Sequence, residues 1–344
     1  MKRVCVVTGS RADYGLLRWV MGGLKDSSKC TLQLIVTGMH LSDEFGSTWK
    51  SIEDDGFDID YKIEMLLGSD TKVAVTKSVG LATIGFADAF EILNPQLLVL
   101  LGDRFEILAA ATAALVAGIP IAHLHGGELT EGAFDDAIRH SITKMAFLHF
   151  TAAEEYRNRV IQMGEDPSRV WNVGGFGLDG ASRAKLIDKA QLAESLGIEF
   201  GEKPLLVTFH PETMGESTSA QQMDEVLSAL EDIDSQLIFT MPNADVDGRI
   251  IIAMIQSFVS QYPERACLHA SLGQSRYFSL LACISGVVGN SSSGLIEAPY
   301  FGVGTVNIGD RQKGRMRASS VIDCAPERKA IKAAIHKLFD SGFQ

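Results

Sequence analysis

Several features that mark particular classes of protein are missing from this sequence. Its cysteines are scattered, with no close pair: Cys5, Cys30, Cys267, Cys283 and Cys324. This spacing argues against a disulfide framework or a zinc site and fits a reducing cytoplasm. The opening apolar run is too short for a signal peptide, and no segment is expected to span a membrane. We therefore expect a cytoplasmic protein without a membrane partner.

Basic residues are also in short supply. The chain of 344 residues has 31 Lys and Arg against 43 Asp and Glu, which gives a net charge of −12. Because nucleic acids and anionic membranes attract positive surfaces, no nucleic-acid partner is expected. A small anion can still bind where a few cations converge. Hydrophobic residues at 46% and charged residues at 22% are ordinary for a globular protein, and the length predicts two domains.

The stretch from Leu97 to His140 organises the prediction for the first half of the chain. LLVLL reads as a buried parallel strand, an Ala-rich helix follows, and IPIAHLH is the next strand. Asp103 follows the first of these strands and Glu128 follows the second, while Asp135 and Asp136 begin the next helix. Ligands of open α/β sheets bind outside the carboxyl ends of the strands. The carboxylates of Asp103 and Glu128 are therefore expected to face one crevice.

Strand and helix patterns alternate along the rest of the chain. RVCVVTG, a Gly-Ser-Arg turn and an amphipathic helix open it, but the turn lacks the GxGxxG fingerprint of dinucleotide-binding proteins. The polar, glycine-rich stretch before PLLVTFH reads as a linker, and GVGTVNIG reads as the last strand. These patterns predict an α/β protein with a first Rossmann-like lobe over residues 1–175, a linker over 176–203 and a second lobe over 204–344.

Six motifs then carry a resemblance to a known family. GSRADYG, LGDRFE, HGGE followed by DDAIRHSITKM, FHPET, GNSSSGLIEAP and NIGDRQKGR resemble the hydrolysing UDP-N-acetylglucosamine 2-epimerases of sialic-acid biosynthesis. These enzymes belong to the larger UDP-N-acetylglucosamine 2-epimerase family, and the match covers nearly the whole chain. The resemblance implies a GT-B fold, with two Rossmann-like lobes and an active-site cleft between them. It also implies a homodimer or homotetramer and a C-terminal helix that usually returns to the first lobe, beyond the point at which this sequence ends.

The resemblance implies a two-stage reaction on a UDP-sugar, with neither a cofactor nor a metal. UDP leaves carbon 1 as the proton on carbon 2 is removed, which gives 2-acetamidoglucal, and water then adds to give N-acetylmannosamine. Such chemistry needs a base near carbon 2, an acid or base for hydration and a cationic site for the diphosphate. By their match to family residues, the implied catalytic residues are Asp103, Glu128 and Asp135, with His210 near the diphosphate.

The resemblance also implies a set of residues that bind the UDP part of the substrate. Ser291 and Ser292 lie where a helix is expected to begin, and helix N-termini attract phosphate groups. Glu297 matches the family residue that holds the ribose hydroxyls, and Tyr277 could lie against uracil. The implied substrate-binding residues are Arg11, Asn243, Tyr277, Ser291, Ser292, Glu297 and Arg311.

Structural roles remain open for several of these residues. Asp103 could cap the Ala-rich helix, and Asp135 could cap the next helix and pair with Arg139 four residues later. His123 and His125 form an H-x-H pattern on a strand, but no third ligand has the spacing of a metal site.

His210 could be a hydrogen-bonded histidine at the end of a strand. Lys313, Arg315 and Arg317 read as a solvated basic loop rather than as phosphate ligands.

Other functions also remain open. Hydrolysing epimerases for UDP-N,N'-diacetylbacillosamine, in legionaminic-acid synthesis, resemble this sequence almost equally. The two sugars differ at positions 4 and 6, and no residue here indicates which of them is recognised. A UDP-sugar-dependent GT-B glycosyltransferase or a UDP-sugar sensor would share the second lobe. HGGE argues against a non-hydrolysing epimerase, and the missing glycine fingerprint argues against an NAD-dependent oxidoreductase.

Overall fold

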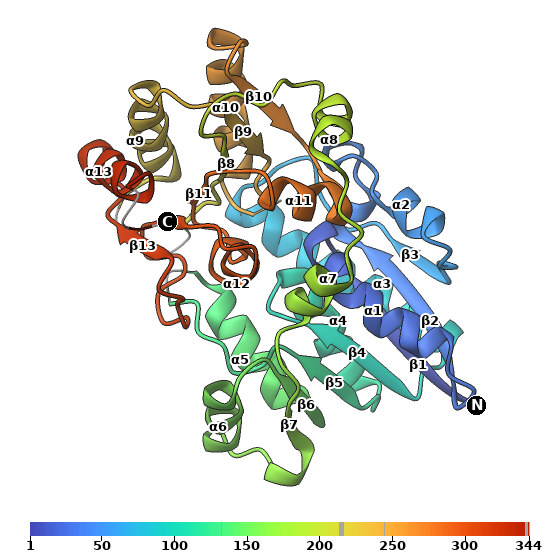
Figure 1. Cartoon of the computed structure of the whole chain (residues 1–344). Coiled ribbons are helices and arrows are strands. Elements are labelled where there is room, and N and C mark those ends of the chain that lie inside the picture. Colours follow the sequence, from blue (N-terminus) through green and yellow to red (C-terminus); the bar gives the residue numbers. More distant parts are fainter. Residues whose placement is uncertain (132, 213–216, 244, 341–342, 344) are drawn as a thin grey trace. The chain divides into compact units, whose positions relative to one another are not determined.

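A computed structural model describes residues 1–131, 133–212, 217–243, 245–340 and 343. The chain divides into two compact units. Unit 1 comprises Met1–Leu129 and Phe134–Asp179, and unit 2 comprises Thr130–Ala133 and Gly180–Gln344. Each unit is built on one parallel β-sheet with helices packed against it (Figure 1). The expectation of an α/β fold with two Rossmann-like lobes is confirmed.

Unit 1 contains a seven-stranded sheet in the order β3-β2-β1-β4-β5-β6-β7. Every pair of neighbouring strands is parallel, and the strands expected from the sequence of this half are all present. The strands are β1 (Lys2–Thr8), β2 (Cys30–Thr37), β3 (Tyr61–Ile63), β4 (Leu97–Leu101), β5 (Ile121–Leu124), β6 (Leu148–Thr151) and β7 (Val170–Asn172).

The helices of unit 1 cover both faces of this sheet. Side chains alternate along each strand, so Cys5 and Val7 of β1 pack with the first group of helices, whereas Val4 and Val6 pack with α1. The first group comprises α3 (Lys72–Leu93), α4 (Phe105–Val116) and α5 (Asp135–Met145). The others are α1 (Arg11–Lys25), α2 (Trp49–Asp54), α6 (Glu154–Gln162) and the 3-10 turns η1 (Gly38–Leu41), η2 (Asp43–Phe45) and η3 (Pro167–Arg169).

Helix α3 corrects one expectation from the sequence. By length and composition it is apolar enough to cross a membrane, whereas we expected no segment of that kind. The pattern was missed because Lys77 and Asp88 interrupt the apolar run. One face of α3 packs on the sheet through Ala82 and Phe86, which are fully buried, and the core helix of a folded domain passes the same test.

Unit 2 contains a six-stranded parallel sheet in the order β10-β9-β8-β11-β12-β13. Its strands are β8 (Leu205–Thr208), β9 (Leu237–Thr240), β10 (Ala266–His269), β11 (Gly286–Gly289), β12 (Thr305–Ile308) and β13 (Val321–Cys324). The expectation that GVGTVNIG is the last strand is wrong, because β13 follows it, and β10 was not expected either. Both missed strands lie at the edges of the sheet, where they are only partly buried and carry a weaker apolar signal.

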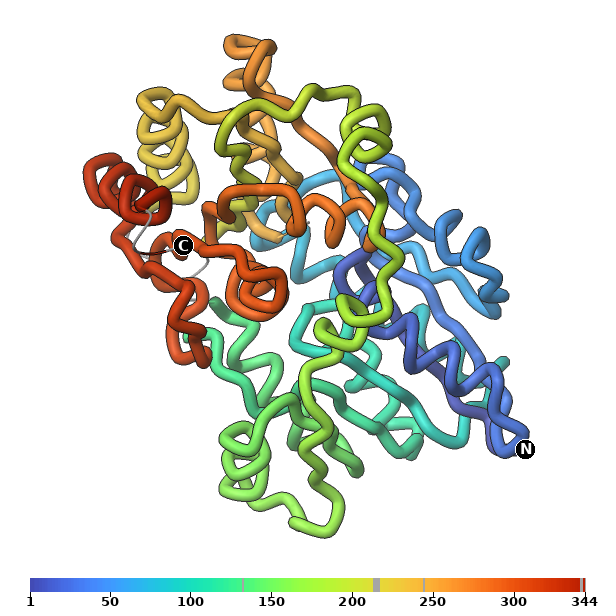
Figure 2. Tube along the Cα trace, in the orientation of Figure 1, coloured from blue at the N-terminus to red at the C-terminus, as the bar shows by residue number. Residues whose placement is uncertain are grey.

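The helices of unit 2 also form two layers. Those on one face are α9 (Ser219–Glu231), α10 (Gly248–Gln261) and α13 (Arg328–Leu338), and those on the other are α8 (Lys189–Leu196), α11 (Gly273–Leu281) and α12 (Ser293–Tyr300). The stretch that we interpreted as a linker carries α7 (Phe176–Arg183) and α8. Leu192 and Leu196 of α8 are buried in the core of unit 2, so this part of the stretch packs on that unit, and Figure 2 shows an extended segment between the two helices.

Each sheet has one place where the direction of strand addition reverses. In unit 1 this switch lies between β1 and β4, and in unit 2 it lies between β8 and β11. Polar residues that follow such strands face a common crevice, which is the usual ligand site of open α/β sheets. The two switch points therefore set where chemistry can take place in each unit.

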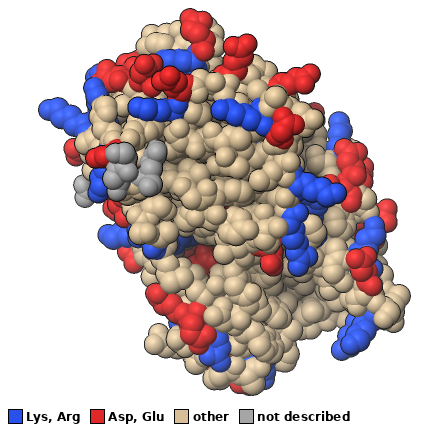
Figure 3. Space-filling view, viewed as in Figure 1, with Lys and Arg blue, Asp and Glu red and all other residues tan. Residues whose placement is uncertain are grey.

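Charged side chains of both signs lie on the face of the molecule shown in Figure 3. On the face shown in Figure 3, acidic and basic side chains are interspersed and leave wide uncharged areas between them. The excess of acidic residues in the composition thus does not appear there as one acidic patch.

Gly289 at the end of β11 provides a test of the switch point in unit 2. Its φ is +141°, and a Cβ atom would lie 1.9 Å from the carbonyl oxygen of Thr208 on β8. We expect Gly289→Ala to lower the free energy of unfolding by about 2 kcal/mol or more, because backbone must move. Gly22→Ala on α1 is the control, since nothing lies near the added atom and it should stabilise by about 0.5–1 kcal/mol. Denaturant unfolding measures both, and an unaffected Gly289→Ala would contradict the close approach.

Candidate active site

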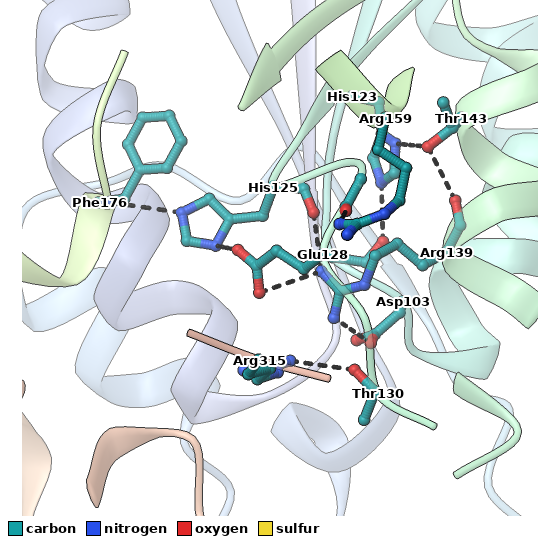
Figure 4. A network of polar contacts seen from close by, with 12 residues as sticks. Asp103, His123, His125, Glu128, Thr130, Arg139, Thr143, Arg159, Phe176 and Arg315 are labelled. Atoms are coloured by element: carbon teal, nitrogen blue, oxygen red, sulfur yellow. Dashed lines mark hydrogen bonds and ion pairs between the residues drawn. The ribbon is translucent and has the colours of Figure 1, made fainter. Parts of the chain in front are cut away.

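A buried arginine on α5 holds the polar network of unit 1 together (Figure 4). The Arg139 guanidinium is hydrogen-bonded through Nη2 to the Asp103 carboxylate, and Nη1 donates to the carbonyl oxygen of His125 at 2.7 Å. Nη1 also lies 3.6 Å from Oε2 of Glu128. Burial lowers the pKa of Arg139, but the Asp103 and Glu128 carboxylates more than compensate and raise it above its ordinary value. Arg139 therefore stays charged and brings the two predicted acids to one place.

His125 orients the other side of Glu128. Nε2 of its ring accepts the backbone N–H of Phe176 at 3.3 Å, and Nδ1 lies 3.0 Å from Oε1 of Glu128. A ring nitrogen that accepts cannot carry the proton, so the proton of neutral His125 is on Nδ1 and is donated to Glu128. The Phe176 ring stacks on the imidazole at 5.1 Å between centroids. His125 itself has φ +61°, a conformation that non-glycine residues rarely adopt and that is common at functional sites.

The glycine before Glu128 is required by close packing. Gly127 has φ +81°, and a Cβ atom there would lie 2.4 Å from the carbonyl oxygen of Tyr156 on α6. Arg159 of the same helix donates to the carbonyl oxygen of Gly127. The turn that presents Glu128 is thus fixed by its backbone contacts with α6.

His123 and His125 do not share a set of partners. Nε2 of His123 donates to the carbonyl oxygen of Gly102 at 2.8 Å, and Nδ1 lies 3.1 Å from the Thr143 hydroxyl. Burial lowers the pKa of His123 to about 3, so the ring is neutral. Within the described ranges, no group of three His, Cys, Asp or Glu side chains is placed to hold a metal ion.

Neither Asp103 nor Asp135 occupies the N-cap of the helix that it precedes or begins. The residue at the N-cap of α4 is Arg104 and that of α5 is Phe134, and neither side chain makes a capping hydrogen bond. Asp103 instead contacts Arg139. Asp135 lies in the first turn of α5, where its charge contributes to the raised pKa of Arg139.

A second buried cluster lies at the switch point of unit 1. Nε of Arg104, after β4, donates to Oε1 of Glu106 at 2.6 Å, and both side chains are almost completely buried. Asp13, on the first turn of α1, is buried beside them. Burial raises the pKa of Asp13 to about 7, the charge of Arg104 opposes this shift and that of Glu106 adds to it. Three ionisable groups thus share one buried region next to the ends of β1 and β4.

Arg11, predicted to bind substrate, is the first residue of α1 and is partly exposed. Its charge lowers the pKa of the neighbouring His40, although burial is the larger cause and the value is about 3. His40 is held by the Thr8 hydroxyl at 3.0 Å and the Thr48 hydroxyl at 2.7 Å. The turn after β1 is therefore rigidly supported where Arg11 emerges.

In unit 2, a reciprocal pair of hydrogen bonds joins the ends of β8 and β11. The side-chain oxygen of Asn290 accepts the backbone N–H of His210 at 2.7 Å, and its amide donates to the carbonyl oxygen of His210 at 2.8 Å. Nδ1 of His210 accepts the backbone N–H of Asn243 at 3.2 Å. The structure thus brings His210 and Asn243 together, and the switch point is tied by a residue whose role was not predicted.

The loop after β12 carries Arg311 to the same region. Nη1 of Arg311 and Nε2 of Gln312 donate to the carbonyl oxygen of Asn290, at 3.4 and 2.8 Å. Oε1 of Glu212 accepts the backbone N–H groups of Asp310 and Arg311, at 2.8 and 3.1 Å. Glu212 therefore fixes the start of the loop, and Arg311 lies beside the residues that follow β11.

The remaining predicted binding residues lie on α11 and around the start of α12. Ser291 and Ser292 precede α12, and Ser292 occupies its N-cap without a side-chain capping bond. The Tyr277 hydroxyl of α11 contacts the Ser293 hydroxyl, so Tyr277 lies against the beginning of α12. Glu297 lies on the same helix, about one turn further on. Thr213 of FHPET and Ala244 of PNAD lie outside the described residues.

Two arginines of the basic loop have side-chain partners. Nε of Arg317 pairs with Asp323 at 2.8 Å, and Arg315 donates to the Thr130 hydroxyl at 3.3 Å. Arg317 is exposed, and its partner on β13 is six residues further along the chain, whereas Arg315 is partly exposed and its partner Thr130 is distant in the sequence.

Sequence reasoning missed several residues that organise the site. Arg139 was considered only as a partner for Asp135. Its position one turn after the two aspartates that begin α5 could have indicated a cation among carboxylates. Asn290 stands in the quoted GNSSSG motif and Glu212 in FHPET, but only their neighbours were singled out. Asp13 stands in GSRADYG, and Arg104 and Glu106 stand in LGDRFE. These motifs come together only because β1 and β4 are neighbours in the sheet, which the sequence does not show.

Two Rossmann-like units, each with a polar cluster at its switch point, define an α/β protein of the GT-B class. The chain belongs to the UDP-N-acetylglucosamine 2-epimerase family, whose model matches residues 23–344.

Curated relatives span nearly all of this chain. It is 40% identical to the GDP/UDP-N,N'-diacetylbacillosamine 2-epimerase (hydrolyzing) of Campylobacter jejuni, over 100% of this chain and 89% of the relative. It is 39% identical to polysialic acid biosynthesis protein P7 of Escherichia coli, over 100% and 88%. It is 36% identical to the UDP-N,N'-diacetylbacillosamine 2-epimerase (hydrolyzing) of Legionella pneumophila, over 98% and 89%.

Solved structures share the fold. The UDP-GlcNAc 2-epimerase of Neisseria meningitidis, bound to UDP-GlcNAc, has a TM-score of 0.81 at 16% identity, over 99% of this chain and 92% of that one. The enzyme of Methanocaldococcus jannaschii, in complex with UDP-GlcNAc and UDP, has a TM-score of 0.81 at 15% identity, over 100% and 94%.

The raised pKa of Asp13 gives a pH-dependent prediction. Its pKa of about 7 lies above the ordinary value of 3.8, so between these values the unfolded chain releases a proton that the folded chain retains. Stability contributed by this group is therefore present below about pH 4 and is lost as the pH rises to about 7. We expect Asp13→Asn to gain thermal stability relative to the wild type from pH 5 to pH 8. Asp26→Asn, at the exposed end of α1, is the control. If the melting temperatures of the wild type and of both variants changed with pH in the same way, the raised pKa of Asp13 would be contradicted.

Proposed function

We propose that this protein is a hydrolysing 2-epimerase that converts UDP-N-acetylglucosamine and water into N-acetylmannosamine and UDP. The observation that carries the proposal is the buried arrangement of Asp103 and Glu128 around Arg139, with His125 on the far side of Glu128. Membership of the epimerase family and the hydrolysing relatives at 36–40% identity support it.

The reaction requires acids and bases rather than a redox group. A base removes the proton from carbon 2, the electron pair of that bond forms the carbon 1–carbon 2 double bond, and the bond from carbon 1 to UDP breaks. Water then adds its hydroxyl to carbon 1 and a proton arrives at the opposite face of carbon 2. Asp103, Glu128 and Asp135 are the proposed bases and acids for these steps.

The environment of Glu128 suits a group that exchanges protons. One oxygen faces the Nδ1–H of His125 and the other faces Arg139, so its position is fixed by donors on both sides. Fixed donors stabilise charge that develops during the reaction without reorganising, and this is usually a large contribution to catalysis.

Residues of unit 2 are the proposed binding site for UDP. Arg311 supplies a guanidinium beside the turn after β11, and His210 lies at the end of β8. Ser291 and Ser292 precede a helix N-terminus, which favours phosphate. Glu297 is proposed to accept the ribose hydroxyls, Tyr277 to lie against uracil, Asn243 to contact the nucleotide and Arg11 of unit 1 to contact the diphosphate.

A second substrate is favoured by a specific observation. Relatives at 40% and 36% identity carry names for the hydrolysing 2-epimerase of N,N'-diacetylbacillosamine nucleotides, whereas the 39% relative is named for polysialic acid biosynthesis. Both candidate sugars carry an acetamido group at carbon 2 and differ at positions 4 and 6. The same elimination and hydration therefore apply to either, and incubation with each UDP-sugar separates them by the free sugar released.

Arg311→Ala should weaken the binding of UDP and of the UDP-sugar together. A charge-assisted contact contributes about 1.5–3 kcal/mol, which corresponds to a roughly 10- to 150-fold higher Kd by calorimetry. Lys313→Ala, an exposed cation of the same loop, is the matched control and should change little. Unchanged UDP affinity of the Arg311 variant would place it outside the site.

The carboxylate variants complete this comparison. Asp103→Asn and Glu128→Gln preserve side-chain size and should leave UDP affinity near that of the wild type while strongly reducing kcat, because they act on the sugar. Normal turnover in either variant would show that the corresponding acid is structural.

Reaction in heavy water tests the mechanism. Hydration delivers a solvent proton to carbon 2, so the expected product is N-acetylmannosamine with deuterium at carbon 2 and one UDP released per turnover. Mass spectrometry and proton NMR of the free sugar measure this outcome. A glycosyltransferase or simple hydrolase breaks only a bond to carbon 1, so unlabelled N-acetylglucosamine would exclude the proposed function.

A further inference from the structure

The loop after β12 is held by a carboxylate from a distant part of unit 2. Oε1 of Glu212, in the segment after β8, accepts the backbone N–H groups of Asp310 and Arg311 at 2.8 and 3.1 Å. Glu212 precedes these residues by 98 and 99 positions, so only the fold brings the two segments together. The Glu212 carboxylate thereby fixes the backbone from which the Arg311 side chain extends.

The other oxygen of Glu212 is anchored to helix α9. Oε2 accepts a hydrogen bond from Nε2 of Gln222 at 2.9 Å, and Gln222 is almost completely buried. Nε2 of Gln222 also donates to the Ser217 hydroxyl at 2.9 Å. With donors on both of its oxygens, the carboxylate cannot turn without breaking hydrogen bonds to an ionised group, which are stronger than neutral ones. Glu212 is therefore a rigid support for the loop.

Gly309, directly before the residues that Glu212 holds, is required by this contact. Its φ is +74°, and a Cβ atom there would lie 2.1 Å from Oε1 of Glu212. The backbone N–H of Gly309 donates to the carbonyl oxygen of Cys324 on β13 at 2.9 Å, so the glycine is itself held in place. Any larger residue at this position would therefore displace the carboxylate from the loop.

The contact leaves the guanidinium of Arg311 available to a ligand. Glu212 bonds to the backbone of Arg311, and the side chain donates through Nη1 only to a backbone oxygen, that of Asn290, at 3.4 Å. In the part of the chain that the structure describes, no carboxylate forms an ion pair with Arg311. A guanidinium whose charge is not paired suits an anionic group such as a phosphate.

We propose that Glu212 is a positioning residue for binding of the diphosphate and that it acts through Arg311. The inference rests on the proposed function, in which Arg311 binds the diphosphate of the UDP-sugar, and it adds a residue that does not touch the ligand. Holding the loop in place before the ligand arrives reduces the conformational entropy that is lost on binding. An acid paired with the guanidinium itself would instead compete with the diphosphate.

A purely structural role for Glu212 would give a different result. Loss of a structural contact lowers the free energy of unfolding but leaves the affinity of the folded protein for UDP unchanged. A positioning role predicts a loss of affinity, and that loss depends on the presence of Arg311. Measuring both unfolding and binding on the same variants therefore separates the two roles.

A double-mutant cycle on the full chain tests the coupling, with UDP as the ligand. Glu212→Ala should raise the Kd for UDP about tenfold, because the loop loses two charge-assisted hydrogen bonds that hold Arg311. Arg311→Ala should raise the Kd at least as much. The double variant should have the Kd of Arg311→Ala alone, because no guanidinium remains for Glu212 to position. Isothermal titration calorimetry measures all four proteins.

Glu212→Gln separates the position of the side chain from its charge. The glutamine oxygen can accept both loop N–H groups, and the Gln222 amide can turn to offer its Oε1, which has no hydrogen-bond partner among the described residues. This variant should therefore recover most of the affinity and bind UDP within about threefold of the wild type.

A glycine variant gives the same test with Glu212 present. Gly309→Ala displaces the carboxylate and should weaken UDP binding as Glu212→Ala does. Gly302→Ala is the matched control, because φ is +70° there and nothing lies within 4 Å of the added atom, so it has the strain without the collision and should leave the Kd unchanged. Circular dichroism verifies that each variant is folded. If Glu212→Ala does not fold, the cycle is completed with Gly309→Ala and Arg311→Ala.

Four results would overturn the inference. The first is an unchanged Kd of folded Glu212→Ala when Arg311→Ala binds UDP weakly, which would leave the proposed function intact. The second is an equal effect of Glu212→Ala with and without Arg311, which would show that Glu212 does not act through the arginine. The third is a Glu212→Gln variant that binds no better than Glu212→Ala. The fourth is an unchanged Kd of Arg311→Ala, which would remove the diphosphate site of the proposed function together with this inference.

Discussion

The reversal of strand order in each parallel sheet is the constraint on which the candidate site depends. Two neighbouring strands, β1 and β4, are followed by connections that run to opposite faces of the sheet, and the same holds for β8 and β11. No connecting helix therefore covers the ends of these strands, and a crevice is left there. The buried Asp13, Arg104 and Glu106 lie at the first of these places, and the reciprocal hydrogen bonds of His210 and Asn290 lie at the second. Gly289 permits the close approach that the second requires, because a side chain there would collide with β8.

Buried charge in unit 1 is arranged in two different ways. Arg139 is surrounded by Asp103, Glu128 and a backbone carbonyl, so its charge is compensated and its pKa is raised. Asp13 shares a single arginine with Glu106, and burial then dominates and raises the pKa of its carboxyl to about 7. A compensated cation fixes geometry independently of pH, whereas an incompletely compensated acid makes stability depend on pH. The two clusters therefore respond differently to pH although they lie at the ends of neighbouring strands.

The sequence by itself determined the α/β class, most strands and helices, the family and the position of Asp103 and Glu128 at strand ends, because apolar runs, glycine turns and short motifs are local signals. It did not reveal β10 and β13, whose edge positions weaken the apolar pattern, or the helices in the supposed linker. Only the tertiary structure decided that Arg139 lies between the two acids, that His125 donates to Glu128 and that Asn290 joins β8 to β11. These contacts link residues up to 80 positions apart, and their partners follow from strand order rather than from spacing along the chain.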